Sequence, residues 1–370
     1  MRIALVHDYL TQFGGAERVL EALMELFPNA PVFTLVYDKD RLGNIDERRL
    51  RPSFLQRLPG TQRSHRYFPL ALMPLAIEQF NLKDFDVILS ATHSFSKGII
   101  HPSRTLHISY CFTPTRYAWD DSHKYVREFS RSTFFQKFAP LALSYIRQWD
   151  YYASQRVDCY VTLSHHVARR IKKYYNREAV VVYPPVDVKR FAVSSTDKGY
   201  YLVVSRMLPY KRVDLAVAAC EKLGRILKVV GTGPEFEDLR RRRGQHTEFL
   251  GFVPDEELPA LYAGAKALLF PQEEDFGITP LEAAASGKPT IAYRAGGAVE
   301  TVVEGVTGIF FEEQTPAALV EAIVRFESQR FDPLTIRSHA EKFDRQRFLD
   351  EMRELVQNEW MRHQQLKVKK

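Results

Sequence analysis

Short apolar runs rich in β-branched residues recur along the chain, and most are separated by stretches in which apolar residues repeat at helical spacing. In the first half these runs are Ile3–Val6, Val32–Tyr37, Val87–Ser90, Leu106–Cys111, Val157–Leu163 and Val180–Tyr183. Uninterrupted apolar runs are typical of strands buried on both faces, and alternation of strand with helix predicts a parallel sheet covered by helices on both sides. The first half is therefore predicted to be an open α/β domain.

The alternation is interrupted near the middle of the chain and then resumes. Pro184 and Pro185 are adjacent, and two consecutive prolines can continue neither a helix nor a central strand. Beyond a polar stretch over 194–199, strands are predicted at Tyr201–Ser205, Ile226–Val230, Ala267–Phe270, Thr290–Tyr293 and Gly308–Phe311, and helices at Val213–Leu223 and from Pro234. We therefore predict two domains, over 1–185 and 186–345, and a final helix over 346–370 that packs back on the first domain.

Two similar α/β domains suggest a cleft between them, and ligands of such sheets bind outside the carboxyl ends of the strands. Gly14 and Gly15 follow the first predicted strand and open a helix, so their N–H groups could approach a phosphate. The full GxGxxG spacing is absent, so an ordinary strand-to-helix turn is the alternative.

Arg206 and Lys211 follow the first strand of the second domain. A guanidinium and an ammonium together suit a diphosphate, and a solvated basic turn is the alternative.

A second group of polar candidates follows the predicted strand Ala267–Phe270. Glu274 is expected on a loop, where its carboxylate could accept hydrogen bonds from sugar hydroxyls. Glu282 is expected inside the next helix, where its carboxylate could hold a ribose diol; from their spacing alone, the two acids could also be surface residues. Backbone N–H groups at a helix start suit a phosphate, and the residues at this start are Phe276, Gly277, Ile278 and Thr279.

The composition limits the classes of function without choosing among them. Lysine and arginine total 52 against 45 acids, which gives a net charge of +7 and a pI of about 9.1. This balance suits a nucleic acid, an anionic membrane surface or a phosphate-bearing substrate. We find no recognition-helix, zinc or RNA-binding aromatic signature, and no GxGxxG of a nicotinamide-binding protein. Since no apolar run is long enough for a signal peptide or a membrane span, a cytoplasmic location is expected.

The predicted first domain carries a basic and apolar segment. Its members are Arg48, Arg49, Arg51, Arg57, Arg63 and Arg66, interleaved with Phe54, Leu55, Leu58, Tyr67 and Phe68, and a second run is Phe134–Phe138. Cationic and aromatic side chains together suit an anionic bilayer surface. The chain could then associate peripherally with the inner face of a membrane and meet a lipid-linked glycan; a solvated basic face over a core helix is the alternative.

Several motifs, in their order along the chain, resemble the retaining glycosyltransferases of family 4. They are GGAERVL, HSFSKGI, PPVD, SRMLPYKRVDL, VVGTGPEFEDL, FLGFVPDEEL and EDFGITPLEAAASGKPTIAYRAGGAVETV. The resemblance implies the GT-B fold, in which two Rossmann-like doubly wound domains face each other across a cleft, and it implies no metal. It also implies that Arg206 and Lys211 bind the diphosphate, that Glu274 contacts the donor sugar, that Glu282 contacts the ribose, and that Gly15 faces the diphosphate.

The motifs PYKRVDL and RYAWD resemble a sub-group of bacterial polysaccharide mannosyltransferases. This implies retaining transfer of a hexose, with GDP-mannose as the favoured donor, no other cofactor, and a glycan or lipid-linked acceptor; same-face attack is the expected mechanism. Relatives often have histidine where this chain has Phe112, so a side-chain role there is in doubt, and His93 is another catalytic candidate. The alternatives are a nucleotide-sugar epimerase of the same architecture and a non-enzymatic basic nucleic-acid-binding protein.

Overall fold

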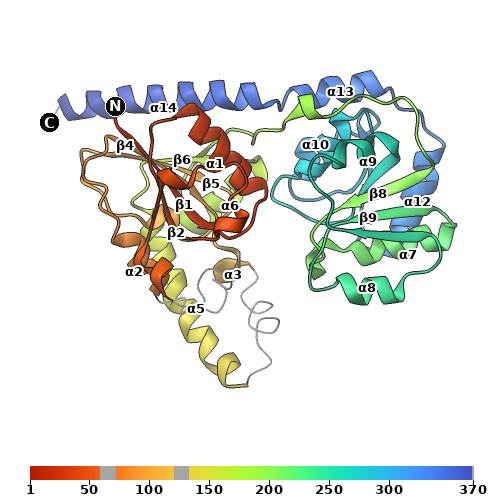
Figure 1. Cartoon of the computed structure of the whole chain (residues 1–370), viewed down its shortest axis with the longest axis horizontal. Helices are drawn as coiled ribbons and strands as arrows, with labels where there is room; N and C mark the ends of the chain where they lie inside the picture. The colour runs from red at the N-terminus through yellow and green to blue at the C-terminus, as the bar shows by residue number, and fades with distance from the viewer. Residues whose placement is uncertain (59–71, 121–132, 369–370) are drawn as a thin grey trace. The chain divides into compact units, whose positions relative to one another are not determined.

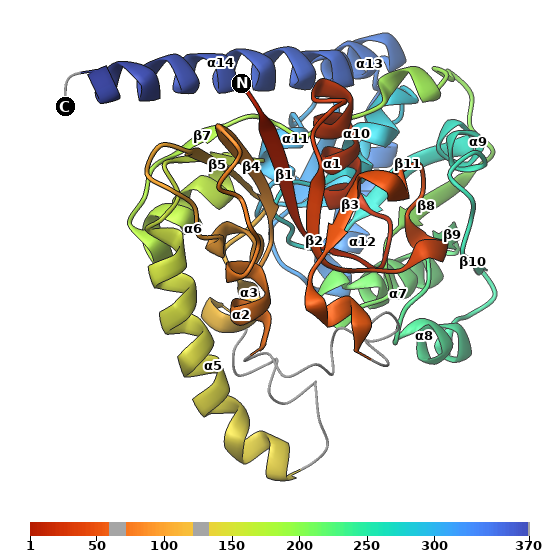
Figure 2. The ribbon, with the colours of Figure 1, turned by 60° about the vertical axis from the view of Figure 1, so that its left-hand side comes forward.

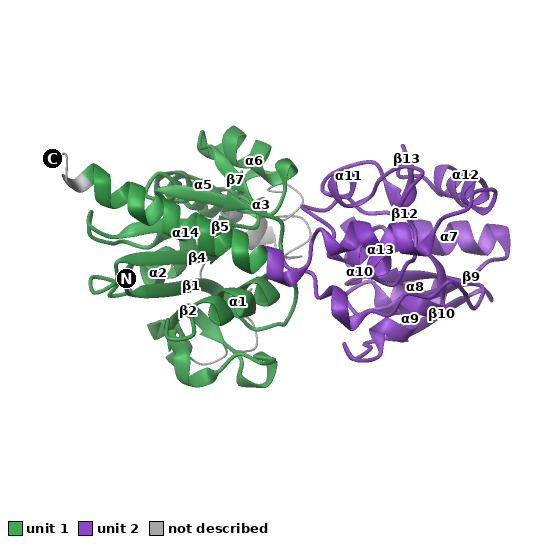
Figure 3. Cartoon of the chain, turned by 90° about the horizontal axis from the view of Figure 1, so that it is seen from above, with its two compact units in different colours: residues 1–184, 348–370 green, residues 185–347 purple. Residues whose placement is uncertain are grey.

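The computed structural model describes residues 1–58, 72–120 and 133–368. Contacts divide the chain into an N-terminal unit, formed by 1–184 with 348–370, and a C-terminal unit, formed by 185–347 (Figure 3). The division lies between the two adjacent prolines, Pro184 and Pro185. Helix α14 (Arg345–Val368) begins in the C-terminal unit, and its residues from Phe348 onward belong to the N-terminal unit.

The N-terminal unit is built on a parallel sheet of seven strands, in the order β3-β2-β1-β4-β5-β6-β7. The strands are β1 Ile3–Leu10, β2 Val32–Tyr37, β3 Leu50–Pro52, β4 Val87–Thr92, β5 Leu106–Cys111, β6 Cys159–Thr162 and β7 Ala179–Val181. Its helices, besides α14, are α1 Gly15–Leu26, α2 Leu72–Glu78, α3 Arg116–Trp119, α5 Thr133–Ser154 and α6 His165–Tyr175, and its short 3-10 turns are η1 Lys39–Arg41, η2 Glu47–Arg49, η3 Phe54–Arg57 and η5 Ser96–Gly98.

Helices cover both faces of this sheet, because its central strands are apolar on both sides. On one face, Val6 and Ile88 pack with Ile77 of α2 and Ile146 of α5. Helices α1 and α14 lie over the other face (Figure 1), where the ring of Phe348 stands 5.9 Å from that of Tyr110. The N-terminal end of α5 extends away from the sheet in both views (Figures 1 and 2).

The C-terminal unit is built on a parallel sheet of six strands, in the order β10-β9-β8-β11-β12-β13. The strands are β8 Tyr200–Val204, β9 Ile226–Val230, β10 Thr247–Gly251, β11 Ala265–Phe270, β12 Thr290–Tyr293 and β13 Gly308–Phe311. The helices are α7 Val213–Leu223, α8 Phe236–Arg242, α9 Leu258–Gly264, α10 Ile278–Ala285, α11 Ala298–Thr301, α12 Pro316–Glu327 and α13 Pro333–Glu341, with 3-10 turns η6 Val188–Arg190 and η7 Pro209–Lys211.

This sheet also lies between two layers of helices. Helices α7 and α12 pack together on one face, and α9, α10 and α13 lie on the other (Figure 1). The core on the α7 side joins alternate residues of the strands, such as Val203 and Leu269, to Leu215 of α7 and Leu319 of α12. The α/β fold with two Rossmann-like units is therefore the one that the alternation of strands and helices predicts.

The strand predictions need correction at β1 and at two edge strands. The first predicted strand ends at Val6, whereas β1 continues to Leu10, so that Asp8 lies inside the strand. Asp8 can remain there because its carboxylate accepts hydrogen bonds from backbone groups near β4. The edge strands β3 and β10 are not predicted, because Leu50–Pro52 and Thr247–Gly251 are only partly buried and form no continuous apolar run.

Candidate functional site

Each sheet reverses its strand order between two neighbouring central strands. In the N-terminal unit these are β1 and β4, and in the C-terminal unit they are β8 and β11. The segments that follow two such strands lead to helices on opposite faces and leave a crevice at the carboxyl edge of the sheet, which is where open α/β sheets bind ligands. The candidate residues of both units lie on these segments.

Lys211 and Glu274 meet at the reversal in the C-terminal unit. The Lys211 ammonium, on η7 after β8, forms an ion pair with Oε1 of Glu274, on the loop after β11. The same oxygen accepts a hydrogen bond from Nε2 of Gln272 at 3.1 Å. The two charged side chains are 12% and 25% exposed, so both are partly buried yet open to a ligand. A cation and an acid 63 residues apart are therefore joined across the two central strands.

Two glycines hold the segment that carries Arg206 and Lys211. Gly231 and Gly233 follow β9, and a Cβ atom on them would lie 1.9 Å from the carbonyl oxygen of Ser205 and 2.4 Å from that of Met207. The N–H of Met207 donates to the carbonyl of Thr232 at 2.9 Å. Glycine is required here because the two backbones touch, so this turn does more than reverse the chain.

A second pair of glycines holds the loop that carries Glu274. A Cβ atom on Gly297 would lie 2.2 Å from Cα of Phe276, and one on Gly296 would lie 2.2 Å from the carbonyl oxygen of Glu274. The N–H of Gly297 donates to that same carbonyl at 2.7 Å. The structure therefore places each glycine pair directly against a candidate binding segment.

Helix α10 starts at the expected position and carries Glu282. Its N-cap, Gly277, has φ 94°, which favours glycine, and the half-buried Ile278 and Thr279 form the first turn. Phe276 is predicted as a donor-binding residue, but its side chain is buried and packs against the ring of Phe343 at 6.0 Å. The side chain of Phe276 therefore belongs to the core of this unit.

Glu282 is the buried member of the glutamate pair. Its side chain is 5% exposed, and Oε2 accepts a hydrogen bond from the hydroxyl of Tyr262 at 2.8 Å. Arg206, in contrast, is exposed, and it lies on the same segment as Lys211. The C-terminal unit thus presents two cations and two acids on the segments that follow β8 and β11.

In the N-terminal unit, Gly14 and Gly15 begin α1. Gly14 is the N-cap in an extended conformation, without a side-chain cap. Glu17, in the first turn of α1, is buried, and its Oε1 lies 3.7 Å from Nε2 of the fully buried His7 of β1. The helix start therefore already has a carboxylate beside it, which reduces its attraction for a phosphate.

Asp8 and His93 join β1 to the segment after β4. The fully buried Asp8 carboxylate accepts hydrogen bonds from four consecutive backbone N–H groups, 93–96, at 2.5–2.8 Å. Its Oδ2 also lies 3.2 Å from Nδ1 of His93, whose side chain is 35% exposed. Burial opposes ionisation of Asp8, but the charges of His93 and His7 and the backbone N–H of His93 outweigh it and keep the pKa of Asp8 below its usual value.

A buried ion pair holds the segment around His93. The ammonium of Lys97 contacts Oδ1 of Asp150 at 2.5 Å, and both side chains are 1% exposed. Asp150 also accepts hydrogen bonds from Thr115 Oγ1 at 2.7 Å and Trp119 Nε1 at 2.8 Å. The HSFSKG and RYAWD segments are therefore tied together through α5.

Phe112 lies at the position where relatives often have a histidine. Its side chain is 8% exposed and packs edge-on against the ring of Tyr110 at 5.4 Å. The residue contributes to the core of the N-terminal unit, and His93 is a partly exposed titratable side chain at this edge of the sheet.

Comparisons with known proteins agree with this arrangement. The family model described as glycosyl transferases group 1 matches residues 186–348, and the model described as glycosyltransferase family 4 matches residues 13–190. Together the two matches span most of the chain. The chain belongs to the family 4 glycosyltransferases. The resemblance that the motifs indicate is thereby confirmed.

Individual relatives of this family 4 glycosyltransferase are similar to parts of it. An uncharacterised glycosyltransferase of Methanocaldococcus jannaschii is 27% identical over 47% of this chain and 50% of its own length. A GDP-mannose-dependent alpha-(1-6)-phosphatidylinositol monomannoside mannosyltransferase of Mycolicibacterium smegmatis is 33% identical over 38% of this chain and 44% of its own. The chain spans about half the length of these curated relatives.

Solved structures share the fold over nearly the whole chain. HepE of Anabaena, in complex with UDP, has a TM-score of 0.70 and 18% identity, covering 97% of this chain and 100% of that chain. Sucrose-phosphate synthase of Thermosynechococcus elongatus has a TM-score of 0.74 and 17% identity, covering 98% and 100%. The fold of the family 4 glycosyltransferase is therefore GT-B.

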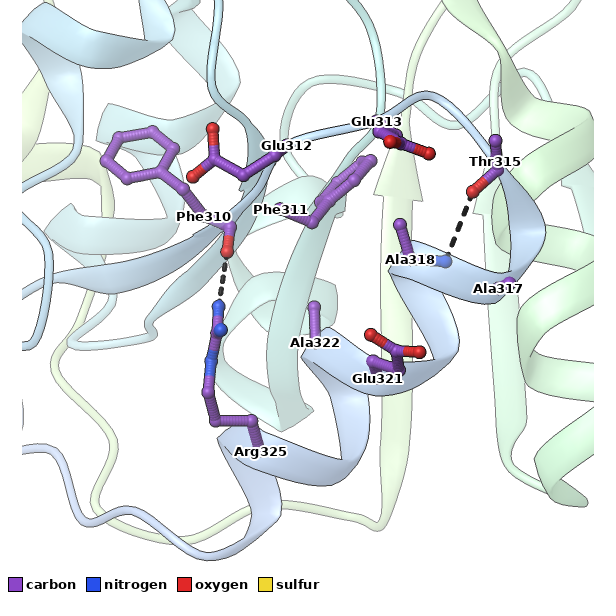
Figure 4. A pocket seen from close by; sticks show the side chains of 10 residues that line it. All are labelled: Phe310, Phe311, Glu312, Glu313, Thr315, Ala317, Ala318, Glu321, Ala322 and Arg325. Atoms are coloured by element: carbon purple, nitrogen blue, oxygen red, sulfur yellow. Dashed lines mark hydrogen bonds between the residues drawn. The ribbon is translucent and has the colours of Figure 1, made fainter.

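One pocket of the C-terminal unit lies apart from the four candidate residues. It has a volume of about 350 Å³ and lies between β13 and α12, and Phe311, Ala318 and Ala322 line it (Figure 4). Three acids, Glu312, Glu313 and Glu321, also line it, and the nearby Arg325 donates to the carbonyl of Phe310. Because acids outnumber cations in its lining, this pocket is a poor place for the diphosphate of a glycosyltransferase donor.

The sequence reasoning missed His7, Asp8, Glu17 and Tyr262. A signal for the first two is present: the apolar pattern of the first strand continues through Tyr9 and Leu10, so a His-Asp pair falls inside a strand. Ionisable residues inside a buried strand are rare and often functional. Nothing in the local sequence around Tyr262 indicates its contact with Glu282.

Proposed function

We propose that the chain is a retaining glycosyltransferase that moves a hexose, with mannose from GDP-mannose favoured, to a glycan or lipid-linked acceptor in bacterial polysaccharide synthesis. The observation that carries this proposal is the contact between Lys211 and Glu274 at the β8/β11 reversal, next to the helix that bears Glu282. A relative whose name includes GDP-mannose supports the choice of donor. HepE, solved with UDP and with UDP-glucose, supports a nucleotide sugar as the class of donor.

In the proposed reaction the nucleoside diphosphate leaves the anomeric carbon while the sugar becomes oxocarbenium-like. Arg206 and Lys211 neutralise the charge that grows on the β-phosphate, and the N–H groups at the start of α10 add to this effect. Glu274 accepts hydrogen bonds from the sugar hydroxyls, and Glu282 accepts them from the ribose. In same-face attack the acceptor hydroxyl bonds to the anomeric carbon, and its proton passes to the leaving phosphate oxygen.

We propose that the N-terminal unit serves the acceptor side of the reaction. His93 is its catalytic candidate, because Asp8 fixes the Nδ1 edge of the ring while the side chain stays 35% exposed. With Nδ1 held, Nε2 is the nitrogen that a substrate hydroxyl would meet.

A binding panel followed by a transfer assay tests the proposal. GDP-, UDP- and ADP-sugars are added to the protein, and the melting temperature is recorded; a ligand at 100 times its dissociation constant stabilises by about 2.7 kcal/mol. The sugar that stabilises most is then supplied with lipid-linked and free glycan acceptors, and the anomeric configuration of the product is read by NMR. An inverted product would reject retention, and no stabilisation by any nucleotide sugar would reject the donor site.

The same assay separates the alternatives. An epimerase would convert the nucleotide sugar without any acceptor, so a new sugar epimer would appear in that control. A nucleic-acid binder would shift DNA with strong salt dependence and give no transfer.

We propose in addition that the N-terminal unit meets an anionic membrane surface. Arg51, Arg57, Phe54 and Leu58 are exposed on one short segment. Arg49 has a structural role instead, because its guanidinium donates to the carbonyl of residue 24 in the last turn of α1 and to those of residues 27 and 30 after the helix, and burial lowers its pKa. Of the other predicted members, Arg63, Arg66, Tyr67, Phe68 and the side chains of Phe134–Phe138 lie outside the described residues.

Helix α5 also exposes apolar side chains. Leu141, Tyr145 and Tyr152, spaced by four and seven residues, are 69%, 50% and 68% exposed. Among the described residues, none of the helices is both long and apolar enough to span a bilayer. Flotation with vesicles containing anionic lipid should carry the wild type upward at low salt, and Arg51→Glu with Arg57→Glu should abolish it. Absence of flotation at low salt would reject the membrane proposal.

A further inference from the structure

Glu282 is a charged residue inside an otherwise apolar helix. Helix α10 has the sequence ITPLEAAA, and Leu281, Ala283 and Ala284 around Glu282 are buried. An ionisable side chain that is only 5% exposed is unusual unless it is paired, and such residues mark functional sites. The position therefore needs an explanation for how the carboxylate is kept in place.

The hydroxyl of Tyr262 supplies one fixed partner. It donates to Oε2 of Glu282 at 2.8 Å, from the middle of α9. A carboxylate offers about four lone-pair positions on two oxygens, so one donor orients the group and leaves acceptor capacity for a diol. Loss of this donor would remove a contact that fixes the direction of the two carboxylate oxygens.

Tyr262 is itself held rigidly. Its ring is fully buried and stands edge-on to the ring of Phe191 at 5.6 Å. The hydroxyl of Tyr200 donates to the carbonyl of Leu261 at 2.7 Å and so anchors α9 to β8. Gly264 allows this approach, because a Cβ atom there would lie 2.6 Å from the Tyr200 hydroxyl oxygen. The carboxylate is thus tied through α9 to a central strand of the sheet.

We propose that Tyr262 is the positioning residue that sets the selectivity of the donor site for a ribose diol. This inference rests on the proposed function, in which Glu282 contacts the ribose. Tyr262 acts through Glu282 and does not touch the sugar. Its hydroxyl fixes the carboxylate so that both ribose hydroxyls can donate to it, and a donor that lacks one hydroxyl leaves a buried acceptor unpaired.

The test compares a nucleoside diphosphate with its 2′-deoxy and 3′-deoxy forms by isothermal titration calorimetry. GDP and UDP are used, and the tighter of the two is carried forward. The wild type should bind the ribose form about 10- to 100-fold more tightly than either deoxy form. This is the difference in affinity expected from the loss of one hydrogen bond to a charged group. In Tyr262→Phe this ratio should fall at least fivefold, mainly through loss of affinity for the ribose form.

Tyr201→Phe is the matched control. Tyr201 is also a fully buried tyrosine of this unit, and its hydroxyl donates to Oε1 of Glu327 at 3.1 Å, away from α10. This variant loses the same kind of bond, so its stability should fall as in Tyr262→Phe while the wild-type ribose ratio is kept. A loss of the ratio in both variants would mean a general loosening of the unit and would overturn the inference.

Glu282→Ala separates this inference from the function on which it rests. If Glu282→Ala keeps the wild-type ratio, the ribose role of Glu282 fails, and the inference about Tyr262 fails with it. If Glu282→Ala loses the ratio and a folded Tyr262→Phe keeps it, the inference about Tyr262 alone is overturned. Should Tyr262→Phe not fold, a crystal structure of the wild type with the diphosphate decides: Tyr262 must remain on Glu282 while the carboxylate binds the ribose.

Discussion

The contact between Lys211 and Glu274 leads to a prediction in which activity and stability respond differently. The perturbations are Lys211→Ala, Glu274→Ala and the double variant. In the proposed reaction Lys211 meets the leaving diphosphate, so its loss should lower kcat/KM by about 10²–10³-fold, or about 3 kcal/mol. Glu274 accepts hydrogen bonds from the sugar, and its loss should lower kcat/KM by about 10- to 150-fold.

The structure limits the loss of stability to a smaller value. With side chains 12% and 25% exposed, the pair lies between a surface ion pair, which contributes at most about 1 kcal/mol, and a fully buried one. When Lys211 is removed, Glu274 keeps the hydrogen bond from Gln272 at 3.1 Å. We therefore expect a loss of about 1–2 kcal/mol, which lowers the melting temperature by about 2–8 °C in a domain of this size.

The double variant distinguishes a role in transfer from a role in folding. Stability losses should not add, because the second substitution removes a partner that is already unpaired. Losses in kcat/KM should nearly multiply, because the two groups meet different parts of the donor. Initial rates at subsaturating donor and urea unfolding measure the two quantities, and Arg225→Ala, which removes a different ion pair of the same unit with Glu327 at 2.7 Å, is the control. If the double variant is no slower than Lys211→Ala, the two residues act as one structural unit and the separate roles are wrong.

Three further predictions concern the segments that hold the site. Gly297→Ala would place a Cβ atom 2.2 Å from Cα of Phe276, so the loop must shift and the rate of transfer should fall at least tenfold. Gly305→Ala is the control, because a Cβ atom there has open space at φ 73°. This control should lower stability by about 1 kcal/mol and leave initial rates within twofold. His93→Asn keeps a donor near Nδ1 and should lose at least tenfold in kcat, while His93→Gln, with its amide near Nε2, should retain more; equal rates in the two would contradict a role for Nε2. Asp8 has a folded pKa below 3.8, so its contribution to stability is complete above that pH and is lost as the pH falls through the folded pKa. Urea unfolding should therefore show that Asp8→Asn is less stable than the wild type at pH 7. Its free energy of unfolding should also change less with pH in the acid range.

Most strands follow from the apolar runs because a strand buried on both faces consists mainly of apolar residues. β2, β5, β9, β12 and β13 begin and end where the sequence predicts. The pattern fails where burial is incomplete, at the edge strand β10, and where a polar group is satisfied by a distant partner, at Asp8. Both failures arise because an apolar run indicates which residues are buried. It does not indicate which backbone groups or polar side chains form hydrogen bonds.

The residues that we propose for the donor site can be selected from the sequence, because motif spacing places Lys211 after one strand and Glu274 after another. The sequence does not show which distant residues these side chains contact. Asp8 and His93 are 85 residues apart and meet only because β1 and β4 are neighbours in the sheet. Tyr262 reaches Glu282 from a different helix, and no local pattern encodes that contact.

The two units share one physical arrangement at the point where strand order reverses. In each, an acid and a cation-capable side chain from the two central strands or their following segments meet: Asp8 with His93, and Lys211 with Glu274. The topology favours this, because the segments that follow the two central strands lead to helices on opposite faces of the sheet. In the reaction that we propose for the C-terminal unit, a nucleotide sugar replaces each member's partner, because its diphosphate meets Lys211 and its hydroxyls meet Glu274. In the N-terminal unit Asp8 is already saturated by four backbone N–H groups, so it can only orient His93. The same topology therefore yields an exchangeable pair in one unit and a fixed pair in the other.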